Sequence, residues 1–172
     1  AAGSFAIAES VWGQGSTNGD IRCAVVGRNG RGKSLIRDVM RTDGARLVAL
    51  CDVDTAVLDE RAANVEEEHG IKVDKVRDYR KLLERKDIDA VVICTPTDMH
   101  ADLIEQFARA KKAIFCEKPI DLDAARVREC LDVVAAEDGF LMVGFNRRFD
   151  PHFMAVRKAI DEGQIGTPEM AI

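Results

Sequence analysis

The sequence predicts an α/β fold built on a doubly wound parallel sheet, and three observations favour it. From Ile21 onward, short apolar runs alternate with amphipathic segments, a pattern typical of parallel strands joined by crossover helices. The first apolar run leads directly into a glycine-rich turn, and the second ends at Asp52. Of the 172 residues, 47% are hydrophobic and 32% are charged, which suits a globular chain able to bury a core.

The first twenty residues differ in composition, and we expect residues 1–20 to form a flexible N-terminal segment. They are small and apolar up to Trp12, then rich in glycine, serine and asparagine. A second interpretation is the remnant of an export signal, because Ala6-Ile7-Ala8 has the small-x-small form of a signal peptidase site.

A strand, a tight turn and a helix are predicted next. The apolar run 23–26 is followed by a turn with three glycines, and apolar residues then repeat at helical spacing over 35–40. Such a turn is an anion site, because glycines let the backbone approach phosphate oxygens and the helix start offers free N–H groups. The turn matches two templates: a P-loop (Gly27 to Ser34) and a dinucleotide fingerprint, G-x-G-x-x-G, in which Asn29 replaces the middle glycine.

Five more strands are predicted downstream, each preceded by a crossover segment. The all-apolar run 47–51 is a strand covered on both faces, and Asp54 caps the helix that ends at Gly70. The later strands are expected at 73–76, 90–94, 113–116 and 140–143, with helices at 79–84, from 97 to 110, and at 122–138. Six strands at this spacing fill a doubly wound sheet.

The last thirty residues do not repeat this unit. A helix is predicted at 149–162, a turn at 163–168, and the opening of a further strand at 170–172. We therefore expect a dinucleotide-binding domain at 21–147, followed at 148–172 by a linking helix and the start of a truncated second domain.

Charge and cysteine content exclude several classes of function. The net charge is −5 and no basic stripe stands out, which argues against nucleic-acid binding; no membrane partner is expected either. None of the five cysteines lies at metal-ligand spacing from another. We expect reduced, buried cysteines and no metal site.

Three side chains stand where ligands bind in open α/β sheets. Asp52 ends the second strand, twenty residues after Gly32, where a carboxylate accepts hydrogen bonds from the adenosine ribose and repels a 2′-phosphate. NAD is therefore favoured over NADP. Lys118 follows the fifth strand and could orient a substrate hydroxyl, and His100 begins the helix after the fourth strand, although a solvated lysine and a packed histidine are the simpler alternatives.

Four motifs in this order resemble the glucose-fructose oxidoreductase, inositol dehydrogenase and rhizopine-catabolism family. They are Gly27-x-Asn29-Gly30-Arg31-Gly32, Thr95-Pro96-Thr97-x-x-His100, Cys116-Glu117-Lys118-Pro119 and the stretch 144–151, Gly-Phe-Asn-Arg-Arg-Phe-Asp-Pro. Each motif is weak alone, but the set is specific and covers the chain from about Ile21 to its last residue.

The resemblance implies a Rossmann domain that binds NAD or NADP, followed by an α/β domain that forms the substrate pocket and the oligomer interface. The implied reaction is hydride transfer between a nicotinamide and a secondary alcohol or hemiacetal of a sugar or cyclitol, by a homo-oligomer. Lys118 would lie beside the nicotinamide and the reacting carbon. The cofactor contacts implied are Gly27, Asn29, Gly30, Arg31, Gly32, Asp52, Thr95, Pro96, His100, Glu117, Lys118 and Asn146.

Two departures from the family pattern qualify this picture. Asn29 stands where a glycine lets the backbone approach the pyrophosphate, although asparagine tolerates left-handed dihedrals and Gly30 lies beside it. The family's Asp and His on a helix of the second domain would lie beyond Ile172, so residues 1–172 alone are expected to bind cofactor without turning over substrate. The predicted location is the cytoplasm, with export as the alternative because some members carry a twin-arginine leader.

Two rival functions remain open from the sequence. A P-loop kinase or NTPase would use Lys33, Ser34 and Asp52, but it leaves Glu117-Lys118-Pro119 without a role. A non-catalytic nucleotide-sensing domain would keep the fold and lose the chemistry. The P-loop expression is easily met by accident, since a Rossmann turn that ends in glycine needs only a following Lys and Ser.

Overall fold

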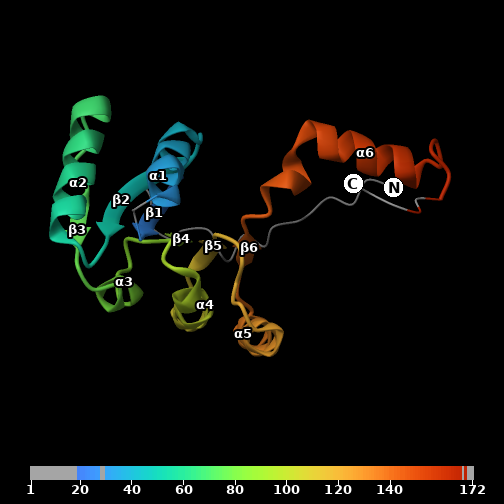
Figure 1. The fold of residues 1–172 in the computed structure, drawn as a ribbon. Helices are drawn as coiled ribbons and strands as arrows, with labels where there is room; N and C mark the ends of the chain where they lie inside the picture. The colour runs from blue at the N-terminus through green and yellow to red at the C-terminus, as the bar shows by residue number, and fades with distance from the viewer. Residues whose placement is uncertain (1–18, 28–29, 168, 170–172) are drawn as a thin grey trace.

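Six parallel strands form one sheet with the order β3-β2-β1-β4-β5-β6 in a computed structural model that describes residues 19–27, 30–167 and 169 (Figure 1). Every neighbouring pair is parallel. The strands are β1 (Ile21–Val26), β2 (Ala45–Cys51), β3 (Asp74–Val76), β4 (Ala90–Ile93), β5 (Ala113–Cys116) and β6 (Leu141–Val143). The predicted doubly wound α/β fold is confirmed.

Helices cover both faces of the sheet. Figure 1 shows α1 (Arg31–Arg41) and α2 (Thr55–His69) on one face, and α3 (Arg80–Leu83), α4 (His100–Arg109) and α5 (Ala124–Ala136) on the other. Two 3-10 turns, η1 (Thr97–Met99) and η2 (Asn146–Phe149), precede α4 and α6 (Pro151–Asp161). The chain builds outward from β1 to β3 and then returns to β4 on the other side of β1. This reversal opens a crevice at the carboxyl ends of β1 and β4, the usual ligand position in such sheets.

The central strands are apolar because they are covered on both faces. In β1, Ala24 and Val25 are fully buried, as are Leu50 in β2 and Ile93 in β4. The α4 helix buries Phe107 completely against the sheet. Two hydrophobic clusters result, one beneath α1 and α2 and one beneath α4 and α5, and they hold the strand ends in fixed positions.

The amino edge of the sheet is closed by paired charges. Arg22 donates from Nε and Nη2 to the carboxylate of Asp89, both at 2.8 Å, and each side chain is only 10% exposed. Lys112 donates from Nζ to the backbone carbonyls of Arg85 and Ile88, at 2.5 and 3.0 Å. Burial lowers the pKa of Lys112. Arg22, Asp89 and Lys112 therefore stabilise the amino ends of the strands and are not available to bind a ligand.

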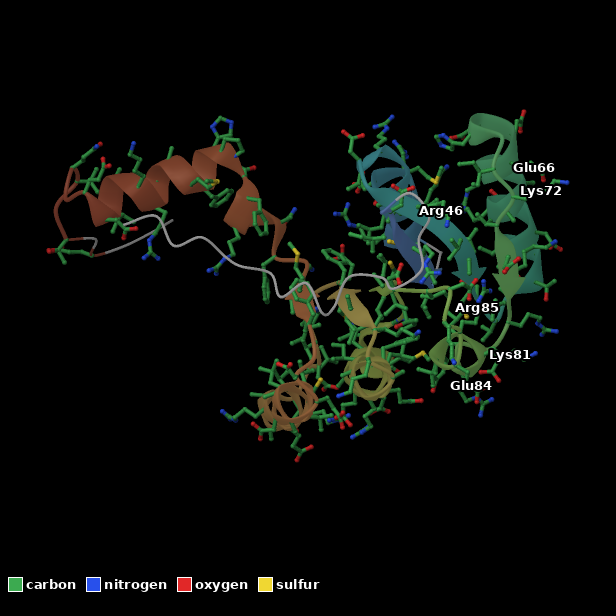
Figure 2. All side chains as sticks on the ribbon, turned by 180° about the vertical axis from the view of Figure 1, so that it is seen from behind. Arg46, Glu66, Lys72, Lys81, Glu84 and Arg85 are labelled. Carbon is green, nitrogen blue, oxygen red and sulfur yellow. The ribbon has the colours of Figure 1, made fainter. Side chains whose placement is uncertain are left out.

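The outer strand β3 is surrounded by ion pairs. Lys75 pairs with Asp59 at 2.7 Å, and Arg85 pairs with Asp74 at 2.8 Å. Figure 2 shows Glu66 and Lys72 together beside α2, where they pair at 3.5 Å, and Arg85 beside α3. Charged side chains along an edge strand discourage pairing with a second sheet.

Some helix and strand boundaries differ from the predicted ones, for local reasons. The helix expected from Leu122 begins at Ala124, because the Asp123 side chain accepts a hydrogen bond from the Ala125 amide. The helix expected from Phe149 begins at Pro151, after η2, and is capped by Asp150. Residues 1–18, Asn29 and the strand expected at 170–172 lie outside the described residues. Within the described part of the chain, no helix has the length and apolar character needed to span a membrane.

Candidate functional site

Two hollows lie side by side along the carboxyl edge of the sheet. The first, of about 440 Å³, lies against the ends of β1, β2 and β3, and the second, of about 360 Å³, lies against the ends of β4, β5 and β6. They share Cys94, Thr95 and Pro96, which follow β4. The edge can therefore hold an elongated ligand with one end in each hollow.

Backbone hydrogen bonds continue past the strand ends and fix the residues of this edge. The amide of Gly27 bonds to the carbonyl of Cys51 at 2.9 Å, and the amide of Glu117 bonds to the carbonyl of Ile93 at 3.0 Å. The amide of Asp52 bonds to the carbonyl of Val76 at 3.1 Å. These residues thus start from rigid positions even though they follow the strands.

Two glycines of the turn are required by close packing. A Cβ atom on Gly27 would lie 2.7 Å from the Thr95 amide nitrogen, and Gly27 has a φ of +78°. A Cβ atom on Gly32 would lie 2.5 Å from the Gly27 carbonyl oxygen. Both distances are shorter than real contacts, so only glycine lets α1 approach the turn and β1 approach β4 this closely.

The start of α1 has neither a side-chain cap nor an acidic residue in its first turn. Asp54, Asp123 and Asp150 cap α2, α5 and α6 with their side chains, and α4, which also lacks a side-chain cap, has Asp102 in its first turn. A helix start that lacks a carboxylate carries partial positive charge and free N–H groups that suit an anion.

The first hollow combines a carboxylate with apolar and aromatic surface. Asp52 lines it, and its Oδ1 accepts a hydrogen bond from the Asp54 amide at 3.0 Å. Tyr79 lines the same hollow and is held by its hydroxyl, which bonds to the Gln106 side chain. Arg77 and Met99 complete the wall. A flat base and a ribose hydroxyl pair fit such a lining.

The second hollow contains the exposed amine of Lys118 and the side chain of Asn146. The Lys118–Pro119 peptide is cis. Thr95 lies between the two hollows, and its Oγ1 is buried without a hydrogen-bond partner among the described residues. A buried hydroxyl with no partner costs free energy, so this position favours a polar ligand atom.

An ion pair crosses the edge from the turn to the second hollow. Arg31 donates from Nε to Glu117 at 2.9 Å, and the Glu117 side chain is 13% exposed. The neighbouring Cys94 thiol is a poor nucleophile, because burial, with a contribution from Glu117, raises its pKa to about 12. The cysteines at 23, 51, 94, 116 and 130 are all free, as expected for reduced thiols.

His100 is buried, with 2% of its surface exposed. Its Nδ1 lies 2.7 Å from the Pro119 carbonyl oxygen and its Nε2 lies 2.8 Å from the Thr95 carbonyl oxygen. The ring therefore joins the turn after β5 to the turn after β4 and lines the second hollow from beneath.

The structure brings most of the predicted residues to this edge. Gly27, Asp52, Thr95, Pro96, His100, Glu117, Lys118, Asn146 and Arg31 line the two hollows, and Gly30 and Gly32 lie at the start of α1. Asn29 lies outside the described residues. Lys33, which the P-loop template requires at this edge, lines a separate groove between α1 and α2.

Sequence reasoning missed Arg77, Tyr79, Met99 and Thr97 as lining residues. Arg77 follows β3 directly and Thr97 follows β4 closely, so their position after a strand end was an available signal. Among the described residues, no group of three or more His, Cys, Asp or Glu side chains could hold a metal ion.

Comparisons with known proteins give a consistent result. Residues 21–145 match the model of an oxidoreductase family with an NAD-binding Rossmann fold. The chain is 56% identical over 150 residues to an inositol 2-dehydrogenase of Rhizobium meliloti, covering 87% of this chain and 43% of that protein. It is 38% identical over 152 residues to a scyllo-inositol 2-dehydrogenase (NAD(+)) of Bacillus subtilis, covering 86% and 42%.

A solved structure has the same fold. The scyllo-inositol dehydrogenase of Lactobacillus casei, with bound NAD(H) and scyllo-inositol, superposes with a TM-score of 0.76 at 32% identity, covering 86% of this chain and 42% of that one. The chain thus spans about two fifths of the length of the relatives it matches.

Proposed function

The chain belongs to the oxidoreductase family with the NAD-binding Rossmann fold, the family that its motifs resemble, and on that premise we propose a specific role. The protein transfers a hydride between NAD and a ring hydroxyl of a cyclitol or a related sugar. The observation that carries the proposal is the continuous edge with Asp52 in one hollow and Lys118 in the other. The relatives that act on inositols support a cyclitol as the substrate.

The chain's own residues fit the dinucleotide along this edge. The start of α1 has no side-chain cap and carries the partial positive charge of the helix dipole, and it binds the pyrophosphate. Asp52 accepts hydrogen bonds from the adenosine ribose and repels a 2′-phosphate, which gives the preference for NAD over NADP. Thr95 Oγ1, buried and unpartnered within the described residues, offers a hydrogen bond at the middle of the cofactor.

Hydride transfer takes place in the second hollow. NAD supplies a hydride acceptor at its nicotinamide when it is bound. The exposed Lys118 Nζ donates a hydrogen bond to the substrate hydroxyl and orients it, while Asn146 lines the same hollow. The proton that leaves the hydroxyl passes to a base of the substrate domain, where the family pattern has its Asp and His. Glu117 is already paired with Arg31, so its carboxylate does not compete for the Lys118 amine.

The wider organisation follows from the same proposal. Residues 21–147 form the cofactor-binding domain, and residues 148–172, which include α6, link it to a substrate domain. The active species is a cytoplasmic homo-oligomer, and its ligands are small molecules rather than nucleic acid or membrane.

A chimera tests the proposed reaction. Residues 1–172 are joined to the remaining part of the Rhizobium meliloti relative, and NADH formation is followed with myo-inositol and scyllo-inositol. Lys118→Ala should lower turnover by about 10²–10⁴-fold and leave NADH binding intact. The matched control is Lys81→Ala, which removes an exposed lysine on α3 (Figure 2) and should leave turnover unchanged.

The outcomes separate the proposal from its rivals. Turnover that is unchanged in Lys118→Ala would remove this lysine from the mechanism. A chimera that binds NADH and turns over no cyclitol would favour the nucleotide-sensing alternative.

A further inference from the structure

A positively charged groove lies between α1 and α2, away from the two hollows. It has a volume of about 370 Å³ and shares no lining residue with either hollow. Figure 1 shows α1 and α2 side by side on one face of the sheet. The cationic side chains that line it are Lys33, Arg37 and Arg41 of α1 and Arg61 of α2, joined by His69.

The three cations of α1 form one stripe along the groove. Lys33, Arg37 and Arg41 are spaced four residues apart, and residues at this spacing lie on the same side of a helix. With a rise of 1.5 Å per residue, the stripe extends over about 12 Å. Arg61 of α2 lines the same groove, and an anion between the helices would reduce the repulsion among these cations.

These cations lack the partners that most others have. Each of the following arginines pairs with a carboxylate: Arg22, Arg31, Arg80, Arg85, Arg109, Arg126 and Arg157. Within the part of the chain that the structure describes, Lys33, Arg37 and Arg41 have no carboxylate within ion-pair distance.

Arg61 points to the same conclusion. Its side chain is only 16% exposed, and Nη1 pairs with Glu60 at 3.0 Å. Its Nε is buried and has no hydrogen-bond partner among the described residues. A buried N–H donor without an acceptor costs folding free energy. A ligand oxygen that reaches Arg61 Nε would remove this cost.

Among the described residues, Glu68 is the one carboxylate that lines the groove, and it lies 3.9 Å from His69. Four Lys or Arg side chains therefore face one acidic side chain. The groove lies between two helices and has a volume of about 370 Å³, so it suits a small ligand better than a flat membrane surface or a nucleic-acid duplex. Guanidinium groups bind phosphate through paired N–H donors.

We propose that this groove binds a small anion carrying two or more phosphate groups. The anion spans the stripe of α1 and accepts a hydrogen bond from Arg61 Nε. It binds on the outer side of α1, whereas the pyrophosphate of the cofactor binds at the start of that helix. The groove is therefore a second ligand site, independent of the hydride transfer proposed above.

A titration with inorganic tripolyphosphate tests the groove. The chain is first saturated with NADH, which fills the carboxyl edge, and binding is then measured by calorimetry at low salt. We expect one-site binding that weakens as salt is added. Arg37→Gln and Arg61→Gln should each weaken it by about tenfold or more, and melting curves confirm that both variants are folded.

Arg128→Gln is the matched control. Arg128 is exposed on α5, on the opposite face of the sheet, and has no ion pair among the described residues. This variant should bind tripolyphosphate as the unsubstituted chain does. The same titration with a short DNA duplex and with anionic vesicles should show weaker binding that is insensitive to Arg37→Gln.

Several results would overturn the proposal. They are no tripolyphosphate binding, equal binding in the Arg37→Gln and Arg61→Gln variants, loss of binding once NADH is present, or tighter Arg37-dependent binding of DNA or vesicles. If NADH itself does not bind, the proposed function fails, and the variant comparison without NADH still decides the groove.

Discussion

Two lysines flank β5 and show how differently the two edges of the sheet are used. Lys112 precedes the strand at the amino edge, where its Nζ donates to the carbonyls of Arg85 and Ile88. Lys118 follows the strand at the carboxyl edge, is exposed, and lines the second hollow. A lysine at one end of this short strand thus stabilises the fold, and a lysine at its other end is left available to a ligand.

The rest of each edge follows the same division. At the amino edge, Arg22 and Asp89 satisfy one another and are almost closed to solvent. At the carboxyl edge, Thr95 Oγ1 is buried without a partner among the described residues, and α1 starts without a side-chain cap. The carboxyl edge thus keeps a buried hydroxyl that the described residues do not use, so substitutions at the two edges should have separable effects.

The largest effect on stability is expected from Asp89→Ala. It leaves Arg22 buried without its carboxylate, and breaking a buried ion pair in this way costs about 3–5 kcal/mol. Chemical denaturation measures the loss. NADH affinity of the folded fraction should stay within about twofold of the unsubstituted value, since the hollows lie at the other edge. A marked loss of affinity at unchanged stability would contradict the division.

The same carboxylate predicts how stability depends on pH. Hydrogen bonds from Arg22 lower the pKa of Asp89 in the folded state. The stabilisation is therefore present above the unfolded pKa of about 3.9 and is lost as pH falls through the lower folded pKa. Asp89→Asn should show a shallower loss of stability on acidification, and an unchanged acid limb would contradict this cause.

Gly27→Ala and Gly44→Ala form the next comparison. Both glycines have a positive φ, +78° and +76°, but a Cβ atom on Gly27 meets Thr95 at 2.7 Å whereas nothing lies within 4 Å at Gly44. Gly44→Ala carries only the left-handed strain, about 1–2 kcal/mol. Gly27→Ala adds overpacking of about 1–3 kcal/mol and should also weaken NADH binding. Equal losses would show that close approach at Gly27 is not a constraint.

The smallest effects on stability are expected from substituting the two lysines that flank β5. Lys112→Ala leaves two carbonyls without their donor and should cost about 1–3 kcal/mol of folding free energy. Lys118→Ala removes an exposed side chain and should change stability by no more than about 0.5 kcal/mol. Thermal melts of both variants measure the difference. A stability loss in Lys118→Ala as large as that in Lys112→Ala would indicate a structural lysine at both edges.

The sequence predicted the sheet and the strand ends well because both depend on local patterns. Apolar runs give the strands, and Asp52 and Lys118 stand directly after such runs. The carboxyl ends of parallel strands share one edge, so residues far apart in sequence could be assigned to one site. The family resemblance, which the matched relatives confirm, favoured the dinucleotide fingerprint over the P-loop as the interpretation of the glycine turn.

The interactions that local patterns do not encode were not predicted. Arg31 and Glu117 are 86 residues apart, and Arg22 and Asp89 are 67 apart. Their pairing depends on strand order, which brings β1 beside β4 and β4 beside β5. His100 was expected at the cofactor groove, but its contacts with two carbonyl oxygens depend on turns after different strands. The expectation that no basic stripe stands out missed Lys33, Arg37 and Arg41, whose four-residue spacing was visible in the sequence, whereas Arg61 across the groove comes from a separate helix.

The most direct test of the proposed NAD site is a fluorescence titration with NADH. NADPH and magnesium-ATP are titrated in parallel, and the Asp52→Ala variant is compared with the unsubstituted chain. We expect NADH to bind more tightly than NADPH and Asp52→Ala to reduce this preference, because the Asp52 carboxylate contacts the adenosine ribose. Tight binding of magnesium-ATP without binding of NADH would contradict the proposed NAD site.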